Sequence, residues 1–433
     1  MIDFERNDYY NACRQKILSG KITSIWRDDT FFKGASSYPV PNFKYYTAEY
    51  CDFEKNIVSA EGKMVYHLNG YGTYHNEALS SFLGESSERY TFASFYRLLE
   101  ERVVLASYNE LVNKHGESRV CSIETLNGYF RQDDKDNYLS EDDQIQWVRM
   151  NSLINTGQDV YMPMQLVVSD SGIIFKNEKR FVPAAVSTGT AGHETFEKAL
   201  YNAIIEVLQI DSFNLWWYGG VKGRNIVIDE EKFLKKYFTD EGRIRKFLSS
   251  FHISFTDISF EKDIDIVVCE VFGLSDNTPK YTIGVQGGTD MENVMYRGLM
   301  ECLAVLEYNL HLPWIDPERY KSVKTDSANH IHNLDDNVVL YSKYGKPDKI
   351  KHDHDIFGYR EKKYEIIDSL KELSNYAGFL DITLPEFYPT NFKVARVIIP
   401  ELLPICLPSY PAYHHIRYKN IGGIRNDYPH PLA

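Results

Sequence analysis

The longest regular pattern of apolar and polar positions in the chain lies between His193 and Trp217. Apolar residues recur there at intervals of three and four, at Phe196, Ala199, Leu200, Ala203, Ile204, Val207 and Leu208. This spacing predicts an amphipathic helix with one buried face. Glu206 and Gln209 fall together at the rim of the apolar stripe, with Asn202 beside them. They are therefore not at the centre of the solvent-facing side.

A second amphipathic pattern predicts a helix from Asn76 onward. Its apolar positions are Ala78, Leu79, Phe82 and Leu83. Ser81, Glu85 and Glu88 fall along the other edge, and Arg89 follows directly. Because Glu85 and Arg89 are four residues apart, they also fit an ordinary surface ion pair. Taken alone, this motif is therefore most simply interpreted as a solvated helix face.

A third helix is predicted after a strand-like run, "DIDIVVCEVFGL", and a glycine-rich turn, "GVQGG". We expect Thr289 and Glu292 to form a capping box at the start of this helix. Its buried stripe is supplied by Val294, Met295, Leu299, Cys302, Leu303 and Leu306. Arg297 and Glu301 share the opposite side, so this helix too carries an arginine and a carboxylate together.

Further strands are predicted at "QDVYMPMQLVVS" and "VARVIIP". Strands alternate with helices, but their uneven spacing argues against a regular doubly wound sheet and favours a mixed α/β (α+β) fold. Residues 1–65 are aromatic and irregular, and we expect them to pack on one larger domain, residues 66–433. The proline-punctuated C-terminal tail is expected to be ordered on that domain, because a core-like strand interrupts it.

Composition narrows the classes of protein that fit. Of the 433 residues, 43% are hydrophobic and 25% charged, as in globular proteins, and the net charge of −13 argues against nucleic acid as a partner. The six cysteines are scattered without a CxxC pair, which indicates reduced thiols in a cytoplasmic protein. Neither a signal peptide nor an apolar run long enough for a membrane helix is present, so no membrane partner is expected.

Carboxylates, or a carboxamide, thus occur with or near arginines on three predicted helices. Carboxylates that converge need a cation, and hard oxygen ligands favour Mg²⁺. Arginine supplies the planar fork that suits phosphate oxygens. Together these groups indicate a magnesium–nucleotide site, and the chain contains no GxxxxGK[ST] segment of the P-loop kind. Three unrelated surface ion pairs are the alternative that the pattern alone leaves open.

Four segments, in this order along the chain, resemble sequence blocks of the YcaO family: "YGTYHNEALSSFLGESSERY", "STGTAGHETFEKALYNAIIEVLQIDSFNLWW", "GGTDMENVMYRGLMECLAVLE" and "DITLPEFYPTNFKVARVIIPELLP". The first is similar to a GKG turn followed by a helix with S-x-x-x-E-x-x-E-R. The second resembles a block that ends in E-x-x-E-R-D, the third one with R-x-x-x-E, and the fourth one with V-x-R-V-x-x-P. The likeness covers roughly residues 68–433.

The resemblance implies a YcaO-type fold, in which several helices build a P-loop-free ATP site. It assigns nucleotide binding to Ser81, Glu85, Glu88, Arg89, Ser187, Glu197, Arg297 and Glu301. It assigns magnesium binding to Glu85, Glu88, Glu206, Gln209 and Glu301. Within these sets the two arginines would bind phosphates. ATP and Mg²⁺ are therefore the cofactors that the resemblance implies.

The chain departs from the family pattern at two positions of this site. The lysine of the GKG turn is Tyr71 here, which removes one phosphate contact. The E-R of the second block is Gln209–Ile210, so an expected carboxylate is a neutral amide. Glutamine can ligate Mg²⁺ through its carbonyl oxygen, but without the charge. A degenerate, non-catalytic scaffold subunit is therefore an alternative.

Members of the family use ATP to activate a backbone amide. The favoured activity is that of a stand-alone cyclodehydratase subunit, which converts Cys, Ser or Thr of a ribosomally made precursor peptide to thiazoline or oxazoline. Azoline-forming members tend to end in P-x-P-x-P, which brings the terminal carboxylate to the site as a proton acceptor. This chain ends Pro429-His430-Pro431-Leu432-Ala433, so Pro429, Pro431 and Ala433 are the catalytic candidates. Peptide thioamidation is the alternative chemistry.

The resemblance also implies partners. Only about 65 residues precede the first block, fewer than a leader-binding winged-helix module needs. We therefore expect a separate leader-binding protein of the E1-like or ThiF-like kind, besides the precursor peptide. A flavin-dependent dehydrogenase commonly follows in such pathways, and a homodimer within a larger complex is compatible with this organisation.

Overall fold

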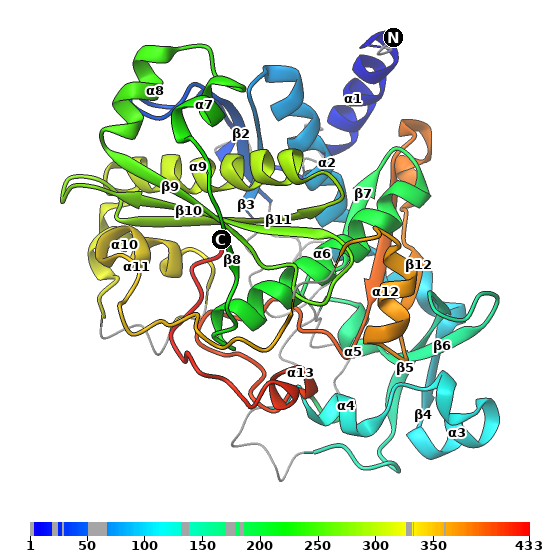
Figure 1. Cartoon of the computed structure of the whole chain (residues 1–433). Coiled ribbons are helices and arrows are strands. Elements are labelled where there is room, and N and C mark those ends of the chain that lie inside the picture. The colour runs from blue at the N-terminus through cyan, green and yellow to red at the C-terminus, as the bar shows by residue number, and fades with distance from the viewer. Residues whose placement is uncertain are drawn as a thin grey trace.

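The structure is a computed structural model. It describes residues 4–19, 25–27, 30–50, 67–130, 138–169, 178–181, 186–325, 331, 333–358 and 361–433. Three antiparallel sheets organise these residues (Figure 1). The first is β1 (Phe32–Ala35), β2 (Lys44–Glu49) and β3 (His67–Gly72). The second, in spatial order, is β11 (Tyr281–Gly288), β10 (Asp265–Gly273), β9 (Phe251–Asp257) and β8 (Arg224–Ile226). The third is β4 (Val103–Ala106), β5 (Ile145–Ser152), β12 (Gly378–Asp381), β13 (Lys393–Ile398) and β7 (Thr190–His193), with β6 (Asp159–Pro163) paired to β5.

Three long helices lie against these sheets: α2 (His75–Ser94), α6 (Phe196–Trp217) and α9 (Met291–Ile315). Helix α2 packs on β3, α9 packs on β10 and β11, and α6 lies between β11 and β13 (Figure 1). The other helices are α1 (Phe4–Leu18), η3 (Phe95–Arg102), α3 (Tyr108–His115), η4 (Glu117–Arg119), α4 (Ile123–Asn127), α5 (Met164–Val167), α7 (Glu230–Lys235), α8 (Glu241–Leu248), α10 (Pro317–Ser322), α11 (Asp336–Tyr344), α12 (Ile366–Leu373), η7 (Pro385–Thr390) and α13 (Ile416–Asn420).

The expectation of a mixed α/β fold is confirmed. Every named strand pairs with its neighbours in the antiparallel direction, and this excludes a doubly wound sheet. A doubly wound fold needs parallel strands joined by crossover helices. The long helix predicted around residues 193–217 is confirmed as α6, where the side chain of Thr195 accepts a hydrogen bond from the Lys198 amide and caps the first turn.

Two glycines allow helices to rest directly on strands. A Cβ atom at Gly70 of β3 would lie 2.2 Å from the Phe82 nitrogen of α2. A Cβ atom at Gly284 of β11 would lie 2.3 Å from the Gly298 oxygen of α9. Both distances are far inside van der Waals contact, so only glycine fits. The backbones of α2 and α9 therefore touch the sheets that support them.

Three local predictions are wrong. The "GVQGG" run is not a turn but the end of strand β11, where glycine is needed for the close approach of α9. The expected capping box of Thr289 is replaced by Asp290, whose Oδ1 accepts hydrogen bonds from the amides of Glu292 and Asn293. The buried strand predicted at "QDVYMPMQLVVS" ends at Pro163, and the short helix α5 follows.

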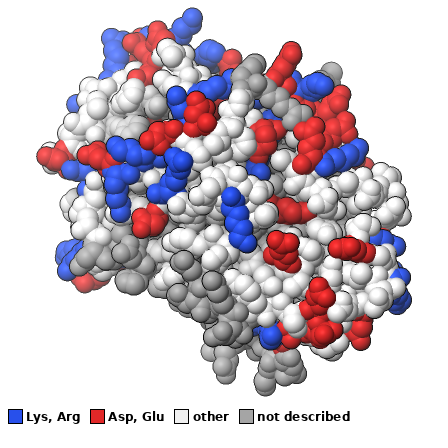
Figure 2. Space-filling model, turned by 60° about the horizontal axis from the view of Figure 1, so that its bottom comes forward, with Lys and Arg blue, Asp and Glu red and all other residues white. Residues whose placement is uncertain are grey.

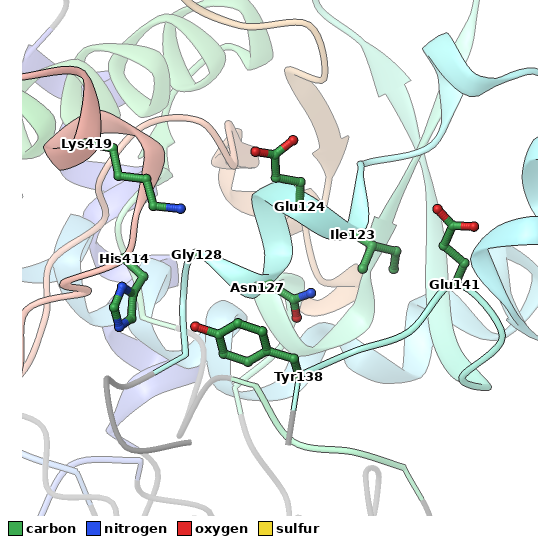
Figure 3. Close-up of a pocket in the computed structure, with 8 residues that line it drawn as sticks. All are labelled: Ile123, Glu124, Asn127, Gly128, Tyr138, Glu141, His414 and Lys419. Carbon is green, nitrogen blue, oxygen red and sulfur yellow. The ribbon is translucent and has the colours of Figure 1, made fainter. Parts of the chain in front are cut away.

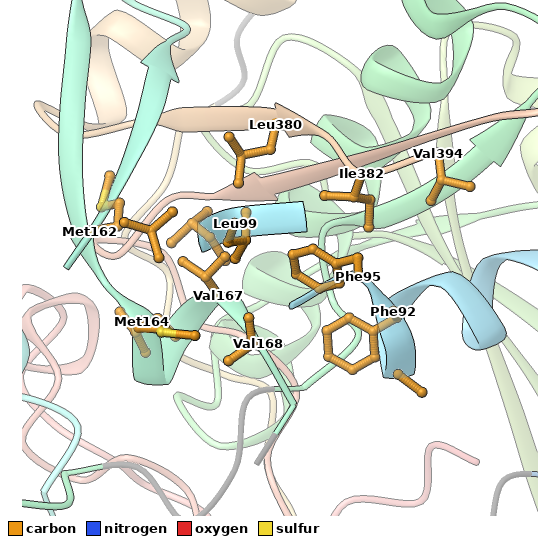
Figure 4. Close-up of a cluster of buried hydrophobic side chains, with 14 of the residues drawn as sticks. Phe92, Phe95, Leu99, Met162, Met164, Val167, Val168, Leu380, Ile382 and Val394 are labelled. Atoms are coloured by element: carbon orange, nitrogen blue, oxygen red, sulfur yellow. The ribbon is translucent and has the colours of Figure 1, made fainter. Parts of the chain in front are cut away.

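Buried apolar side chains join the end of α2 to the six-stranded sheet. Phe92, Phe95 and Leu99 pack with Val167 and Val394 in this cluster (Figure 4). The end of α2 is thereby fixed by hydrophobic burial, the dominant favourable term in folding. The polar edge of the same helix carries the residues of interest for function.

The ends of the chain meet the rest of the molecule in different ways. Strand β2, from the expected N-terminal region, pairs with β3 of the larger region and with β1 on its other side. The expected boundary at residues 65 and 66 lies outside the described residues. In the tail, the Asn337 side chain of α11 donates hydrogen bonds to the carbonyls of His430 (2.9 Å) and Leu432 (2.8 Å). Trp217 Nε1 donates to the Tyr428 carbonyl at 3.0 Å.

The surface mixes both signs of charge. Acidic and basic side chains are interspersed over the face that Figure 2 shows. Within the described part of the chain, no helix combines the length and the apolar character that a membrane crossing requires. The expectation that nucleic acid is not a partner stays a prediction.

Candidate functional site

Helix α2 contributes two carboxylates and a guanidinium that are mostly buried. The exposed fractions of the Glu85, Glu88 and Arg89 side chains are 29%, 17% and 21%. Arg89 Nε lies 3.9 Å from Glu85 Oε1, and Arg89 Nη1 lies 3.9 Å from Glu88 Oε1. Glu85 Oε2 accepts a hydrogen bond from the Asn69 amide of β3 at 3.1 Å. A solvated helix face does not account for this degree of burial.

Helix α6 places a third carboxylate against the segment that leads into β7. Glu206 Oε2 accepts a hydrogen bond from the Gly189 amide at 3.1 Å. Glu88 Oε2 accepts one from the Gly192 amide of β7 at 3.2 Å. Carboxylates from two helices therefore hold neighbouring amides of one backbone segment.

Helix α9 adds the fourth carboxylate, and β11 links it to α6. Glu301 Oε2 accepts hydrogen bonds from the Val285 amide and from Gln286 Nε2, both at 3.0 Å. Gln209 Nε2 donates to the Val285 carbonyl at 2.7 Å. Gln209 and Glu301 are thus connected through a single residue of β11. The amide group of Gln209 is suited to this contact because a carboxylate could not donate to a carbonyl.

Pairwise electrostatic interactions link the four carboxylates into one cluster. Burial, together with repulsion from Glu206 and Glu85, raises the pKa of Glu88 to about 8. Burial raises the pKa of Glu206 to about 7, and burial with a smaller contribution from Glu85 raises the pKa of Glu301 to about 7. The pKa of Glu85 is also raised by burial, and the positive charge of Arg89 partly opposes this.

Such a donor set fits a divalent cation, because buried carboxylates that repel one another are stabilised when a positive charge is placed among them. Among the described residues, however, no three Asp, Glu, His or Cys side chains lie close enough together to form a ready metal site. Binding of a cation would therefore have to draw the carboxylates of α2, α6 and α9 closer together.

Tyr71 lies within the same charged cluster. Burial raises the pKa of its hydroxyl well above the ordinary value, and Glu301 and Glu85 add to this while Arg297 opposes it. The tyrosine that replaces the expected lysine thus places a neutral hydroxyl group, not a positive charge, beside these carboxylates. In the sequence, only the family pattern indicates that position 71 belongs to the site.

The other predicted residues are more dispersed. Ser81, Glu197 and Arg297 are exposed, on α2, α6 and α9, and Ser187 is half-buried in the segment before β7. In the tail, the Pro429 and Pro431 side chains are buried and Ala433 is exposed. The tail carbonyls are bound by α11 and by the end of α6. These contacts do not place Ala433 at the carboxylates.

A separate hollow of about 380 Å³ lies between α4 and α13. Glu124 and Asn127 line it from α4, and His414 and Lys419 line it from the region of α13, with Tyr138 between them (Figure 3). It shares no lining residue with the predicted nucleotide site. The carboxylate cluster, and not this hollow, is therefore the candidate site.

Raising the pH from about 5 to about 8 is expected to destabilise the protein when no Mg²⁺ or nucleotide is present. The folded state, with the pKa of Glu88 raised to about 8, holds protons that the unfolded state has already lost in this range, so unfolding is favoured as the pH rises. The measurement is the thermal unfolding temperature against pH in EDTA. A Glu88→Gln variant is the control and should show a flatter profile; equal slopes for the two proteins would contradict the raised pKa.

No curated protein matches the chain, but several solved structures do. Among solved structures, a chain of the E. coli microcin synthetase McbBCD complex with pro-MccB17 bound matches with a TM-score of 0.65 and 14% identity, covering 93% of this chain and 96% of that one. YcaO from Methanopyrus kandleri bound with AMPPCP and Mg²⁺ matches with a TM-score of 0.54 and 13% identity, covering 92% and 91%. These likenesses confirm the YcaO-type fold.

A third structure, a heterocyclase in complex with substrate and cofactor, matches with a TM-score of 0.60 and 16% identity. The match covers 91% of this chain but 52% of the heterocyclase, so the chain spans about half the length of that protein. The family model described as YcaO cyclodehydratase, ATP- and Mg²⁺-binding, matches residues 69–403. This is most of the chain and includes all four carboxylates of the cluster. The chain belongs to the YcaO cyclodehydratase family.

Proposed function

We propose that the protein is the ATP-dependent cyclodehydratase subunit of a peptide-modifying system. It would convert Cys, Ser or Thr residues of a ribosomally made precursor peptide to thiazoline or oxazoline. The observation that carries this proposal is the partly buried cluster of Glu85, Glu88, Glu206 and Glu301 with Arg89, assembled from three helices of a YcaO-family chain.

In the proposed reaction, the substrate side chain attacks the carbonyl carbon of the preceding residue and closes a ring. The oxyanion would take the γ-phosphoryl group of ATP, with release of ADP. Loss of inorganic phosphate together with the amide proton would then leave the azoline. Glu85, Glu88, Glu206 and Glu301, with the carbonyl oxygen of Gln209, would hold Mg²⁺, which neutralises phosphate charge when bound.

The remaining residues of the site would position the nucleotide and neutralise its phosphate charge. Arg89 and Arg297 would bind phosphate oxygens, for which the guanidinium fork is suited. Ser81, Ser187 and Glu197 would line the nucleotide. A proton must leave the attacking group, and the terminal carboxylate of Ala433, on a tail shaped by Pro429 and Pro431, is the proposed acceptor. Positioning and charge neutralisation dominate such phosphoryl transfers.

A separate leader-binding protein, E1-like or ThiF-like, would present the precursor to this chain, and a flavin-dependent dehydrogenase would oxidise azolines afterwards. The matching microcin synthetase chain comes from a multi-subunit complex with a precursor bound, which supports an assembly of this kind. A homodimer within the complex and a cytoplasmic location complete the proposal.

The test is accurate mass measurement of a Cys/Ser/Thr-rich candidate peptide after incubation with this protein, its leader-binding partner, Mg²⁺ and ATP. Loss of one water per modified residue, with ADP and phosphate released, is the expected result. Exchange of oxygen for sulfur in the presence of sulfide would replace the proposal with thioamidation.

A scaffold subunit is the second candidate, and Tyr71 and Gln209 are the observations that favour it. Tyr71 contributes no positive charge, and Gln209 contributes a neutral amide, whose Nε2 donates to the Val285 carbonyl, in place of a carboxylate. An unchanged peptide and intact ATP, in a complex whose partner is shown to bind the peptide, would favour this candidate over the cyclodehydratase.

A further inference from the structure

One fully buried arginine contacts the backbone of the segment that faces the candidate site. Arg396 of β13 is 1% exposed, and its guanidinium lies over the Phe92 ring at 4.9 Å. The hydrogen bonds run from Nε to the Val167 carbonyl (3.1 Å), from Nη2 to the carbonyls of Leu166 (2.9 Å) and Val186 (3.0 Å), and from Nη1 to the carbonyls of Ser187 (3.3 Å) and Thr188 (2.7 Å) and to Thr190 Oγ1 (3.0 Å). The guanidinium group therefore binds residues 186–190 on the side of the segment that faces the core.

The same segment faces the carboxylates on its other side. The Gly189 amide donates to Glu206 Oε2 at 3.1 Å, and the Gly192 amide donates to Glu88 Oε2 at 3.2 Å. Gly189 has a φ of +85°, and a Cβ atom there would lie 2.3 Å from the Val397 oxygen. Only glycine tolerates both constraints, so the path of the segment is fixed at this point.

A buried guanidinium bound to carbonyl dipoles is costly to maintain, because desolvation of the charge is only partly compensated. An apolar side chain of similar volume would satisfy packing against Phe92 alone. The hydrogen bonds of Arg396 give this side chain a use beyond packing, because they hold the segment whose Gly189 amide meets the carboxylate of Glu206.

We propose that Arg396 is a positioning residue of the nucleotide site, which fixes residues 186–190 so that Ser187 and the Gly189 amide meet the carboxylates and the nucleotide. This inference rests on the proposed function, since it takes ATP with Mg²⁺ as the ligand. Arg396 itself contacts neither ligand. It acts through the backbone of the segment that it holds.

The test compares Arg396→Lys with Arg417→Lys in the full chain. Arg417 is a matched control: it is also buried, at 11% side-chain exposure, but it binds the carboxylates of Asp211 and Glu261. Direct binding of ATP with Mg²⁺ is measured by calorimetry, and KM for ATP and kcat are measured in the peptide assay. We expect Arg396→Lys to weaken ATP binding and to raise KM by about 10-fold or more, as loss of a supporting partner does at metal sites, while Arg417→Lys leaves both unchanged.

The split between KM and kcat separates positioning from a general loss of stability. Partial unfolding would lower the apparent kcat and leave KM for ATP unchanged, whereas displacement of residues 186–190 raises KM. If Arg396→Lys fails to fold, Thr190→Val is used in its place, because it removes one hydrogen-bond acceptor of the Arg396 guanidinium. KM for ATP should then rise in the same direction but by less. Unchanged ATP binding and unchanged KM for ATP in the variant that folds would overturn the inference. Failure of the wild-type protein to bind ATP with Mg²⁺ would instead overturn the proposed function.

Discussion

Replacement of Glu88 with glutamine is expected to lower peptide-dependent ATP hydrolysis by about 10²–10³-fold, the usual effect of removing one preorganised electrostatic group. Glu88 interacts with several members of the cluster, because Arg89 Nη1 lies 3.9 Å from its Oε1 and the charges of Glu206 and Glu85 both act on it. Glutamine has the same shape and can still accept from the Gly192 amide, so the change removes charge with little loss of structure. The measurement is ATP turnover over a Mg²⁺ titration.

Glu101→Gln serves as the control for this experiment. Glu101 lies on η3, directly after α2, and is exposed. Its replacement should leave turnover and the Mg²⁺ dependence as in the wild-type protein. If Glu88→Gln hydrolysed ATP at more than half the rate of this control, the carboxylate cluster would not be the site of catalysis.

Replacement of Asp211 with alanine is expected to lower the free energy of unfolding by about 3–5 kcal/mol, the usual cost of leaving buried charges without their partner. Asp211 is fully buried on α6 and binds Lys262 at 2.8 Å and Arg417 at 2.6 Å. It also accepts a hydrogen bond from the Leu403 amide at 2.9 Å. Denaturant unfolding monitored by tryptophan fluorescence measures the change.

The pH dependence of this contribution has a defined sign. The positive charges of Arg417 and Lys262 outweigh burial and hold the pKa of Asp211 below its ordinary value. A carboxyl group of this kind stabilises the folded state above its unfolded pKa, about 3.9, and the contribution is lost as the pH falls below that value. Asp368→Ala, at an exposed carboxylate, is the control. A stability equal to that of the control would contradict a structural role of the Asp211 network.

The long helices could be predicted because their apolar spacing is a local property of the sequence. The end of β11 could not, because the role of Gly284 depends on the backbone of α9. The start of α9 is predicted at the wrong residue because Thr289 and Asp290 are both good capping residues, and the sequence alone does not choose between them. The family pattern drew attention to the acidic residues, but only the fold shows that Glu88 and Glu206 act on each other. The partners of Arg396 are mostly carbonyl groups from distant residues, and carbonyl groups carry no signature in a sequence.

The contacts at Gly70 and Gly284 have a consequence for how this protein can change over time. Where a helix backbone touches a strand backbone, the separation between them is set by atoms that every sequence shares. Helix α2 is therefore held at a fixed distance from β3, and α9 at a fixed distance from β11, by backbone atoms alone. A side chain larger than hydrogen at Gly70 or Gly284 would push the helix away from its strand, together with the carboxylates that the helix carries.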